Sequence, residues 1–324
     1  KKVKELKEGI EASNSNAFYQ LVYYPVVCSA WMNQKFLYQE KANKYAQHNR
    51  TIANDFAIKA QRAYDSIKVE TRYYNNDLSN GKWKHFMSMK PRDLPVFQLP
   101  PTPSWDIHDN SKWGLALEGS GDIRSQEDVI GSNSTLPRFQ SWNSRKRFVD
   151  IYLQGNKKIK WSAEPSKDWI ELDKYSGKLT PAFLDNQERI WVSINKQELP
   201  DDKHINGKIT FSGSDKELTI YVKVFNPDPE TIADEYVEEN KYVSIFAENY
   251  SNKTSMENRY WQKIDGLGYT GNSMMAKPLI DFSVPEKNNI INAPALEYTF
   301  HTFSKGKSEI TVYCIPTHPI NDNY

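Results

Sequence analysis

Two short segments of the chain carry residue types that can contact a sugar or another small polar substrate. The first is Gly81–Met87, where Trp83 supplies an indole and His85 a titratable imidazole between lysines. An indole can stack on a ring, and an imidazole can take up charge opposite a substrate carboxylate. The alternative is that both side chains only pack and solubilise a domain junction, and the sequence leaves the two interpretations open.

The second group lies near the C-terminus and consists of Trp261, Tyr269 and Glu248. Together they can form a platform on which a sugar stacks, assisted by a carboxylate or by calcium. Large aromatic residues serve a hydrophobic core equally well, and that alternative stays open too. The candidate substrate-binding residues are therefore Trp83, His85, Trp261 and Tyr269, and we predict no catalytic residue.

Motifs of familiar enzymes are missing or out of context. Gly266–Gly271 matches the glycine spacing of a dinucleotide site, but no predicted βαβ unit surrounds it. Ser212-Gly213-Ser214 has the wrong order for a nucleophile elbow. No spacing selects the pair of carboxylates, about 5–9 Å apart, that sugar hydrolysis requires. The six histidines lack zinc-ligand spacing, so we expect neither a metal nor a cofactor.

Composition excludes two further classes of partner. With 42 basic and 41 acidic residues in 324, the net charge is +1, which argues against nucleic acid. The mean hydropathy is −0.74, and no apolar run approaches the ~18 residues of a membrane span. The two cysteines, Cys28 and Cys314, lie far apart in the sequence, and we expect no disulfide between them.

Residues 1–80 have the periodicity of two helices in a hairpin. The first helix is predicted to bury a face that includes Phe18, Leu21, Val22, Pro25, Cys28, Met32 and Phe36. The second is predicted to bury Ile52, Phe56, Ala60, Ala63 and Ile67. Pro25 should kink the first helix, and Asn49 or Thr51 should cap the second. Tyrosines such as Tyr19, Tyr23 and Tyr24 extend beyond the first face, so we expect further helices of a bundle to cover them.

The rest of the chain has the period of two that is typical of β-strands. Short alternating runs follow Trp113, separated by turn residues such as Gly155-Asn156, Ser176-Gly177 and Asn206-Gly207. Two more strands are predicted at Leu296–Phe300 and Glu309–Tyr313. The expected fold is multidomain α plus all-β: a helical hairpin or bundle remnant (1–80), a Pro-rich connector (81–112), an immunoglobulin-like β-sandwich (113–226) and a partial jelly-roll-like β-sandwich (232–324).

Several of these segments, in this order, resemble the C-terminal part of glycoside hydrolase family 115, the xylan α-glucuronidases. The resemblance rests on Ala17–Val26, Gly81-Lys82-Trp83, Trp113–Ser120, Leu136–Phe139, Tyr242–Tyr250, Trp261 and Gly266–Gly271. Two positions depart from the family pattern. Lys90–Pro95 replaces a His-Ile-Gly-Tyr-like stretch, and Phe246 replaces an acidic residue.

The resemblance implies that the chain is the C-terminal part of a longer protein, whose catalytic barrel lies upstream. It implies an accessory, homodimer-forming role in removing glucuronic acid from glucuronoxylan, with no activity in this chain alone. It also implies a secreted or periplasmic location, although no signal peptide precedes the helices. Two other functions remain open, a carbohydrate-binding module and a non-catalytic scaffold or adhesion protein.

Overall fold

The computed structural model describes residues 2–103, 106–119, 122–123, 134–214, 216–232, 236–256, 258–268, 271–279 and 293–315. The chain divides into two compact units, each described by itself below. Unit 1 comprises Lys1–Phe139, Ser144–Pro200 and Ile205–Lys223. Unit 2 comprises Gln140–Asn143, Asp201–His204 and Val224–Tyr324.

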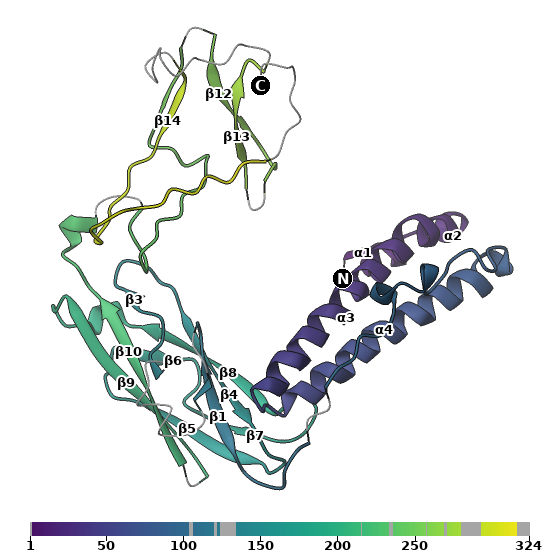
Figure 1. The fold of residues 1–324 in the computed structure, drawn as a ribbon, viewed down its shortest axis with the longest axis horizontal. Coiled ribbons are helices and arrows are strands. Elements are labelled where there is room, and N and C mark those ends of the chain that lie inside the picture. Colours follow the sequence, from purple (N-terminus) through teal and green to yellow (C-terminus); the bar gives the residue numbers. More distant parts are fainter. Residues whose placement is uncertain are drawn as a thin grey trace. The chain divides into compact units, whose positions relative to one another are not determined.

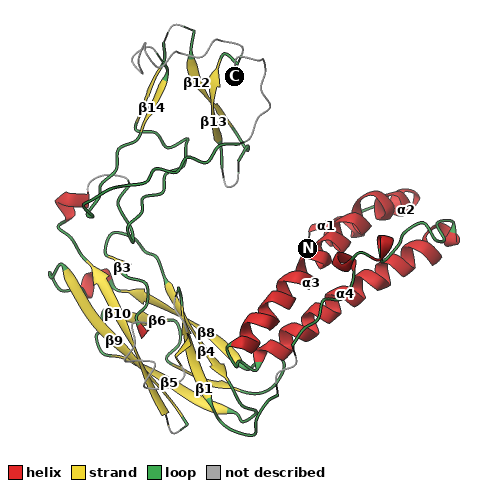
Figure 2. Cartoon of the chain, in the orientation of Figure 1, coloured by secondary structure: helices red, strands yellow, loops and turns green. Residues whose placement is uncertain are grey.

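Unit 1 begins with the predicted helical hairpin (Figures 1 and 2). Helix α1 (Lys2–Glu8) and a short α2 (Ser15–Phe18) lead into the long antiparallel pair α3 (Tyr24–Gln47) and α4 (Ile52–Asn76). A π-helical turn, Tyr19–Tyr23, joins α2 to α3 directly before Pro25. A proline lacks the amide that a regular helical turn would use, so a widened turn at this point accommodates it.

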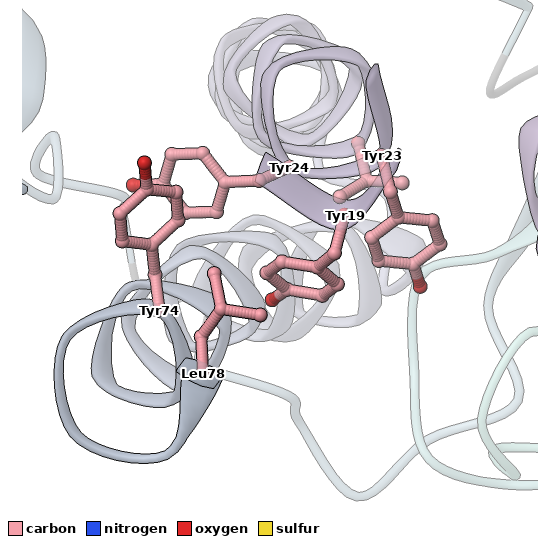
Figure 3. Packing of buried hydrophobic residues seen from close by; sticks show 6 residues of the cluster. Tyr19, Tyr23, Tyr24, Tyr74 and Leu78 are labelled. Atoms are coloured by element: carbon pink, nitrogen blue, oxygen red, sulfur yellow. The ribbon is translucent and has the colours of Figure 1, made fainter. Parts of the chain in front are cut away.

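The core at one end of the hairpin is made of tyrosines (Figure 3). Tyr19, Tyr23, Tyr24, Tyr74 and Leu78 are buried together, and Val3 of α1 packs against them. The Tyr24 hydroxyl lies 2.9 Å from Thr71 Oγ1, and the Tyr19 hydroxyl donates to the Glu70 carboxylate. These contacts satisfy the polar ends of rings whose bodies are excluded from water.

The prediction for the first helix is therefore wrong in its phase. Of the residues predicted to be buried, Leu21 is 74% exposed and Val22 39%, while Phe18 and Cys28 are partly buried against the tyrosine core. Tyr19, predicted to need cover from outside the chain, is 3% exposed. The face predicted for α4 is confirmed, because Ile52, Phe56, Ala60, Ala63 and Ile67 are all buried. The predicted cap is also wrong, because the Thr51 hydroxyl makes no cap bond and donates instead to the Leu153 carbonyl.

The proline-rich connector packs back along the hairpin. The Asn75 side chain donates from Nδ2 to the Met87 carbonyl (2.8 Å) and accepts from the Met87 amide (2.9 Å). Further along, Lys35 Nζ donates to the carbonyls of Val96 (2.7 Å) and Gln98 (2.8 Å). Only short 3-10 turns, Pro91–Asp93 and Pro95–Phe97, interrupt its extended course. We call residues 86–101 the strap.

Lys35 is expected to hold the strap in place. Its side chain is buried, which lowers the pKa of the ammonium group. Lys35→Met keeps the apolar stem but removes both hydrogen bonds, and should cost about 1–2 kcal/mol of stability. The measurement is limited proteolysis, which should cut between Val96 and Pro101 faster in the variant. Equal cleavage rates would contradict this role, and Lys44→Met, at an exposed lysine of α3, serves as the control.

The remainder of unit 1 is built on two five-stranded sheets. The first has the strand order β2 (Asp122–Ile123), β1 (Trp113–Leu117), β4 (Arg147–Leu153), β8 (Gln187–Ile194) and β6 (Ile170–Leu172). The second has the order β3 (Phe139–Gln140), β10 (Lys216–Phe225), β9 (His204–Gly213), β5 (Ile159–Pro165) and β7 (Ser176–Leu179). The predicted α plus β composition is confirmed, while the immunoglobulin-like and jelly-roll-like types remain predictions.

Alternate residues of these strands form a dry core. Val149, Ile190, Phe211, Ile220 and others are fully buried, as their period of two predicts. The Trp113 Nε1 donates across to the Gly213 carbonyl (2.9 Å), which links the two sheets. Two predicted turns are wrong, because Ser176-Gly177 lies in β7 and Asn206-Gly207 lies inside β9. At Gly207 a Cβ would come within 2.7 Å of Ile170, so glycine serves close packing there.

The hairpin is attached to the first sheet by buried polar contacts at the α3–α4 turn. The Asp55 carboxylate accepts from the Leu184 amide (2.9 Å) and from Asn186 Nδ2 (2.8 Å). Arg50 places its guanidinium over the Tyr152 ring, 4.5 Å from the centroid. The Thr51 amide donates to the Leu153 carbonyl (3.0 Å). The two hydrogen bonds to Asp55 compensate the burial of its carboxylate.

Unit 2 contains short strands in two-stranded sheets. Strand β11 (Asn252–Thr254) pairs with β14 (Ala295–Glu297), and β12 (Tyr260–Ile264) pairs with β13 (Ser273–Lys277). The strand predicted at 296–300 is thus partly confirmed, and that at 309–313 is wrong. Tyr313 is 94% exposed and Ile310 86%, and no ladder forms there. A strand needs a hydrogen-bonding neighbour, which alternation of side chains alone does not supply.

Candidate functional site

Trp83 lies in the turn that follows α4. Ser79, Asn80 and Gly81 all have positive φ (52°, 56° and 76°), which reverses the chain and brings Trp83 onto the tyrosine core. The indole is half-buried and meets the edge of Phe86, with ring centroids 5.5 Å apart. Much of its surface is therefore used in packing, and sugar binding by Trp83 remains a prediction.

His85 lies two residues further along and is exposed. Its φ of +67° is unusual for a residue with a side chain and marks the tight turn into the strap. The structure thus brings Trp83 and His85 into one turn, as the sequence predicts, but with different surroundings. Trp83 packs against the helices, and His85 faces solvent.

Glu248 is held by a corner of unit 2 next to β13. Its Oε1 accepts from the Asn272 amide (3.2 Å) and from Asn272 Nδ2 (3.3 Å), and Asn272 Oδ1 in turn accepts from the Gly266 amide (3.1 Å). Bonds from its own backbone amide and from Asn272 lower the pKa of Glu248. A Cβ at Gly271 would lie 2.7 Å from Oε1, so this glycine permits the close approach. The carboxylate is thereby fixed in its charged form.

Trp261 is used as a brace between the two small sheets. The indole Nε1 of this β12 residue donates to the carbonyl of Pro294 (2.9 Å), just before β14, and the ring is half-buried. Tyr269, the other predicted aromatic residue of the platform, lies outside the described residues. The described part of the corner therefore contains an ordered carboxylate and a braced indole, and a sugar platform there remains a prediction.

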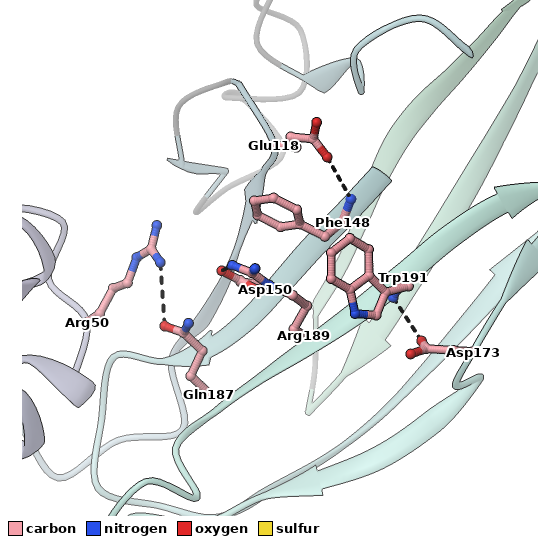
Figure 4. Close-up of polar contacts among 8 residues, drawn as sticks. All are labelled: Arg50, Glu118, Phe148, Asp150, Asp173, Gln187, Arg189 and Trp191. Carbon is pink, nitrogen blue, oxygen red and sulfur yellow. Dashed lines mark hydrogen bonds and ion pairs between the residues drawn. The ribbon is translucent and has the colours of Figure 1, made fainter. Parts of the chain in front are cut away.

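A second polar constellation, not predicted from the sequence, lies on β4 and β8 (Figure 4). Arg189 forms two hydrogen bonds with Asp150, at 2.7 and 2.9 Å, and its guanidinium lies 3.7 Å from the Phe148 ring centroid. The bonds to Asp150 raise the pKa of Arg189. This pair neutralises its own charge and braces the sheet, and it leaves little charge for a ligand.

A basic group on the second sheet was also not predicted from the sequence, and it consists of Lys158, Lys160 and Lys178. All three side chains are exposed. The alternation Lys158-x-Lys160 is a signal that both side chains point to one face of a strand. Lys178 joins them only through the pairing of β5 with β7, which sequence alone does not give.

In the described part of the chain, no group of three or more His, Cys, Asp or Glu side chains could hold a metal ion. Nor does that part of the chain include a helix long and apolar enough to cross a membrane. Cys28 and Cys314 are both free thiols.

The described residues define a chain of helices and β-sheets. Comparison with known families identifies part of it. Residues 235–324 match the Glycosyl hydrolase family 115 C-terminal domain. This match supports the resemblance of this part of the chain to the C-terminal part of a family 115 protein.

Similar solved structures cover only parts of the chain. A family 123 glycoside hydrolase from Clostridium perfringens has 9% identity and a TM-score of 0.27, over 40% of this chain and 30% of that one. The E. coli chaperone DraB has 12% identity and a TM-score of 0.25, over 40% and 61%. SSP-19, an MSP-domain protein from Caenorhabditis elegans, has 8% identity and a TM-score of 0.23, over 28% and 94%. Likenesses this low carry no argument. No curated protein matches the sequence.

Proposed function

We propose that this chain is the non-catalytic, dimer-forming C-terminal part of a secreted or periplasmic enzyme that removes glucuronic acid, or its 4-O-methyl form, from glucuronoxylan. The observation that carries the proposal is the family 115 match at residues 235–324. The order of similar segments along the rest of the chain supports it. The catalytic acids would lie upstream, in the longer protein that we call the parent protein.

The described residues are consistent with an accessory role. The polar groups buried in unit 1, such as Asp55 and Arg50, are engaged in fixing one element to another. Glu248 and Trp261 are likewise held by neighbours within unit 2. A catalytic acid or base needs access to the substrate and a pKa matched to its task. The Asp55 carboxylate is committed to the contact between hairpin and sheet, and hydrogen bonds lower the pKa of Glu248.

The test is a comparison of the parent protein with this chain alone. The parent protein should release glucuronic acid from glucuronoxylan oligosaccharides, measured by chromatography of the products, and this chain should release none. Analytical ultracentrifugation of the parent protein should give a dimer. A folded parent protein that cleaves a different glycoside would overturn the substrate. A folded parent protein that cleaves no glycoside would favour the scaffold or adhesion function instead.

A further inference from the structure

Three lysines gather on the outer face of the second sheet of unit 1. Lys160 of β5 lies directly opposite Lys178 of β7 in the antiparallel register. Directly opposed residues in such a pair have Cβ atoms about 4.5–5.5 Å apart. Lys158 lies two residues before Lys160, on the same face of the chain. All three are exposed, and we call them the lysine cluster.

The lysine cluster is not neutralised by the protein. Among the residues that the structure describes, none of its three ammonium groups forms an ion pair, whereas the neighbouring Lys157 pairs with Asp109 at 3.6 Å. Two like charges directly opposed on a sheet lower its stability. The arrangement is therefore poor for folding, and it leaves uncompensated positive charge at one place on the surface.

Hydroxyl groups extend the cluster into a shallow depression. Ser162 lies opposite Ser176 on one side and Ser212 on the other. The depression has a volume of about 500 Å³ and is lined by Lys158, Ile159, Lys160, Trp161, Ser162 and Ser212–Ser214. Carboxylates on the same face lie beyond the serines: Glu217 accepts from the Ser212 hydroxyl (3.1 Å), and Glu164 follows Ser162 by two residues.

We propose that the lysine cluster binds the carboxylate of an acidic sugar chain, with the serine hydroxyls contacting neighbouring sugar hydroxyls. The proposal rests on the proposed function, which supplies a polysaccharide bearing isolated uronic acids. Lysines act as point charges rather than planar forks, which suits single carboxylates carried on a flexible chain. An extended polyphosphate would need a longer basic surface, which a chain of net charge +1 is not expected to provide.

The test is affinity electrophoresis of the full chain in gels containing glucuronoxylan, polygalacturonate or unsubstituted xylan. The first two should retard the chain, and retardation should weaken with added salt because exposed charges are screened. The double variant Lys160→Ser, Lys178→Ser should bind uronate about tenfold more weakly. It should unfold at the same or a slightly higher temperature, because the like-charge contact is gone. Lys223→Ser, an exposed lysine of β10, is the matched control and should bind normally.

The outcomes separate this inference from the proposed function. Retardation by polygalacturonate but not by glucuronoxylan would retain the uronate site and count against the proposed substrate. Unchanged binding in the double variant, or loss of binding only in Trp261→Ala, would overturn carboxylate binding by the lysine cluster. The proposed function is tested separately, by the enzyme assays of the parent protein. Equal retardation by unsubstituted xylan, or competition by inorganic phosphate as strong as by glucuronate, would also overturn it.

Discussion

Replacing Asp55 by alanine should lower the free energy of unfolding of unit 1 by about 3 kcal/mol. The Asp55 side chain is 7% exposed and is the shared acceptor for the Leu184 amide and Asn186 Nδ2. Without the carboxylate, both donors stay buried with no acceptor, and each such loss costs about 1–3 kcal/mol. Urea unfolding followed by far-UV circular dichroism measures the change, provided that the transition of unit 1 is fitted by itself.

Asp65 provides a matched control for this prediction, since it is an acid on the same helix. Its side chain is 47% exposed and forms an ion pair with Lys68 at 3.3 Å. Asp65→Ala should change the stability by no more than about 0.5 kcal/mol, as exposed pairs generally do. If Asp55→Ala were as mild as Asp65→Ala, the buried contacts would not hold the hairpin to the sheet.

Raising the pH above about 9 should progressively unfold the helical hairpin. Burial raises the pKa of Cys28 from 9.0 to about 12, and burial likewise raises those of Tyr19, Tyr23 and Tyr24 above 10.0. The folded hairpin therefore keeps protons that the unfolded chain has already lost. Stability is complete below the unfolded pKa values and is lost as the pH rises toward the folded ones.

Lys35 acts in the opposite direction, because its lowered pKa makes folding more favourable as the pH approaches 10.5. Cys28 and the three tyrosines oppose the effect of Lys35, so a rise in pH should on balance destabilise the hairpin. Urea unfolding at pH 8, 10 and 11, together with tyrosinate absorbance, measures it. Cys28→Ala should flatten the pH dependence, since it removes one such group. Tyrosinate forming at its ordinary pH while the helical signal persists would contradict the prediction.

The two helices show how far periodicity predicts a core. On α4, small and aliphatic residues repeat on one face, and that face is buried. Along the π-helical turn and α3, Leu21, Val22 and Pro25 fit the same kind of repeat, yet the buried stripe runs through Tyr19, Tyr23 and Val27. Partners on α4, Glu70 and Thr71, receive the tyrosine hydroxyls and make their burial favourable. Those partners become visible only once the helices are paired.

The contacts at the candidate sites likewise depend on which helices and strands pair. The sequence groups Trp83 with His85 because they share one turn, and it marks Glu248 beside a glycine-rich loop. It does not show that Trp261 braces Pro294, since these residues are 33 positions apart. The lysine cluster depends on the register of β5 against β7, in which a shift by one residue would send Lys178 to the other face.

The Asn75 amide pairs with both backbone groups of Met87, as a neighbouring strand would, and this makes the contact sensitive to a single chemical change. Slow hydrolysis would turn this amide into a carboxylate and leave an oxygen facing the Met87 carbonyl where a donor now stands. The new oxygen and the Met87 carbonyl would repel each other at the first contact between the strap and α4. A protein hydrolysed at this one side chain would therefore loosen the strap while the β-sheet core of unit 1 stays intact.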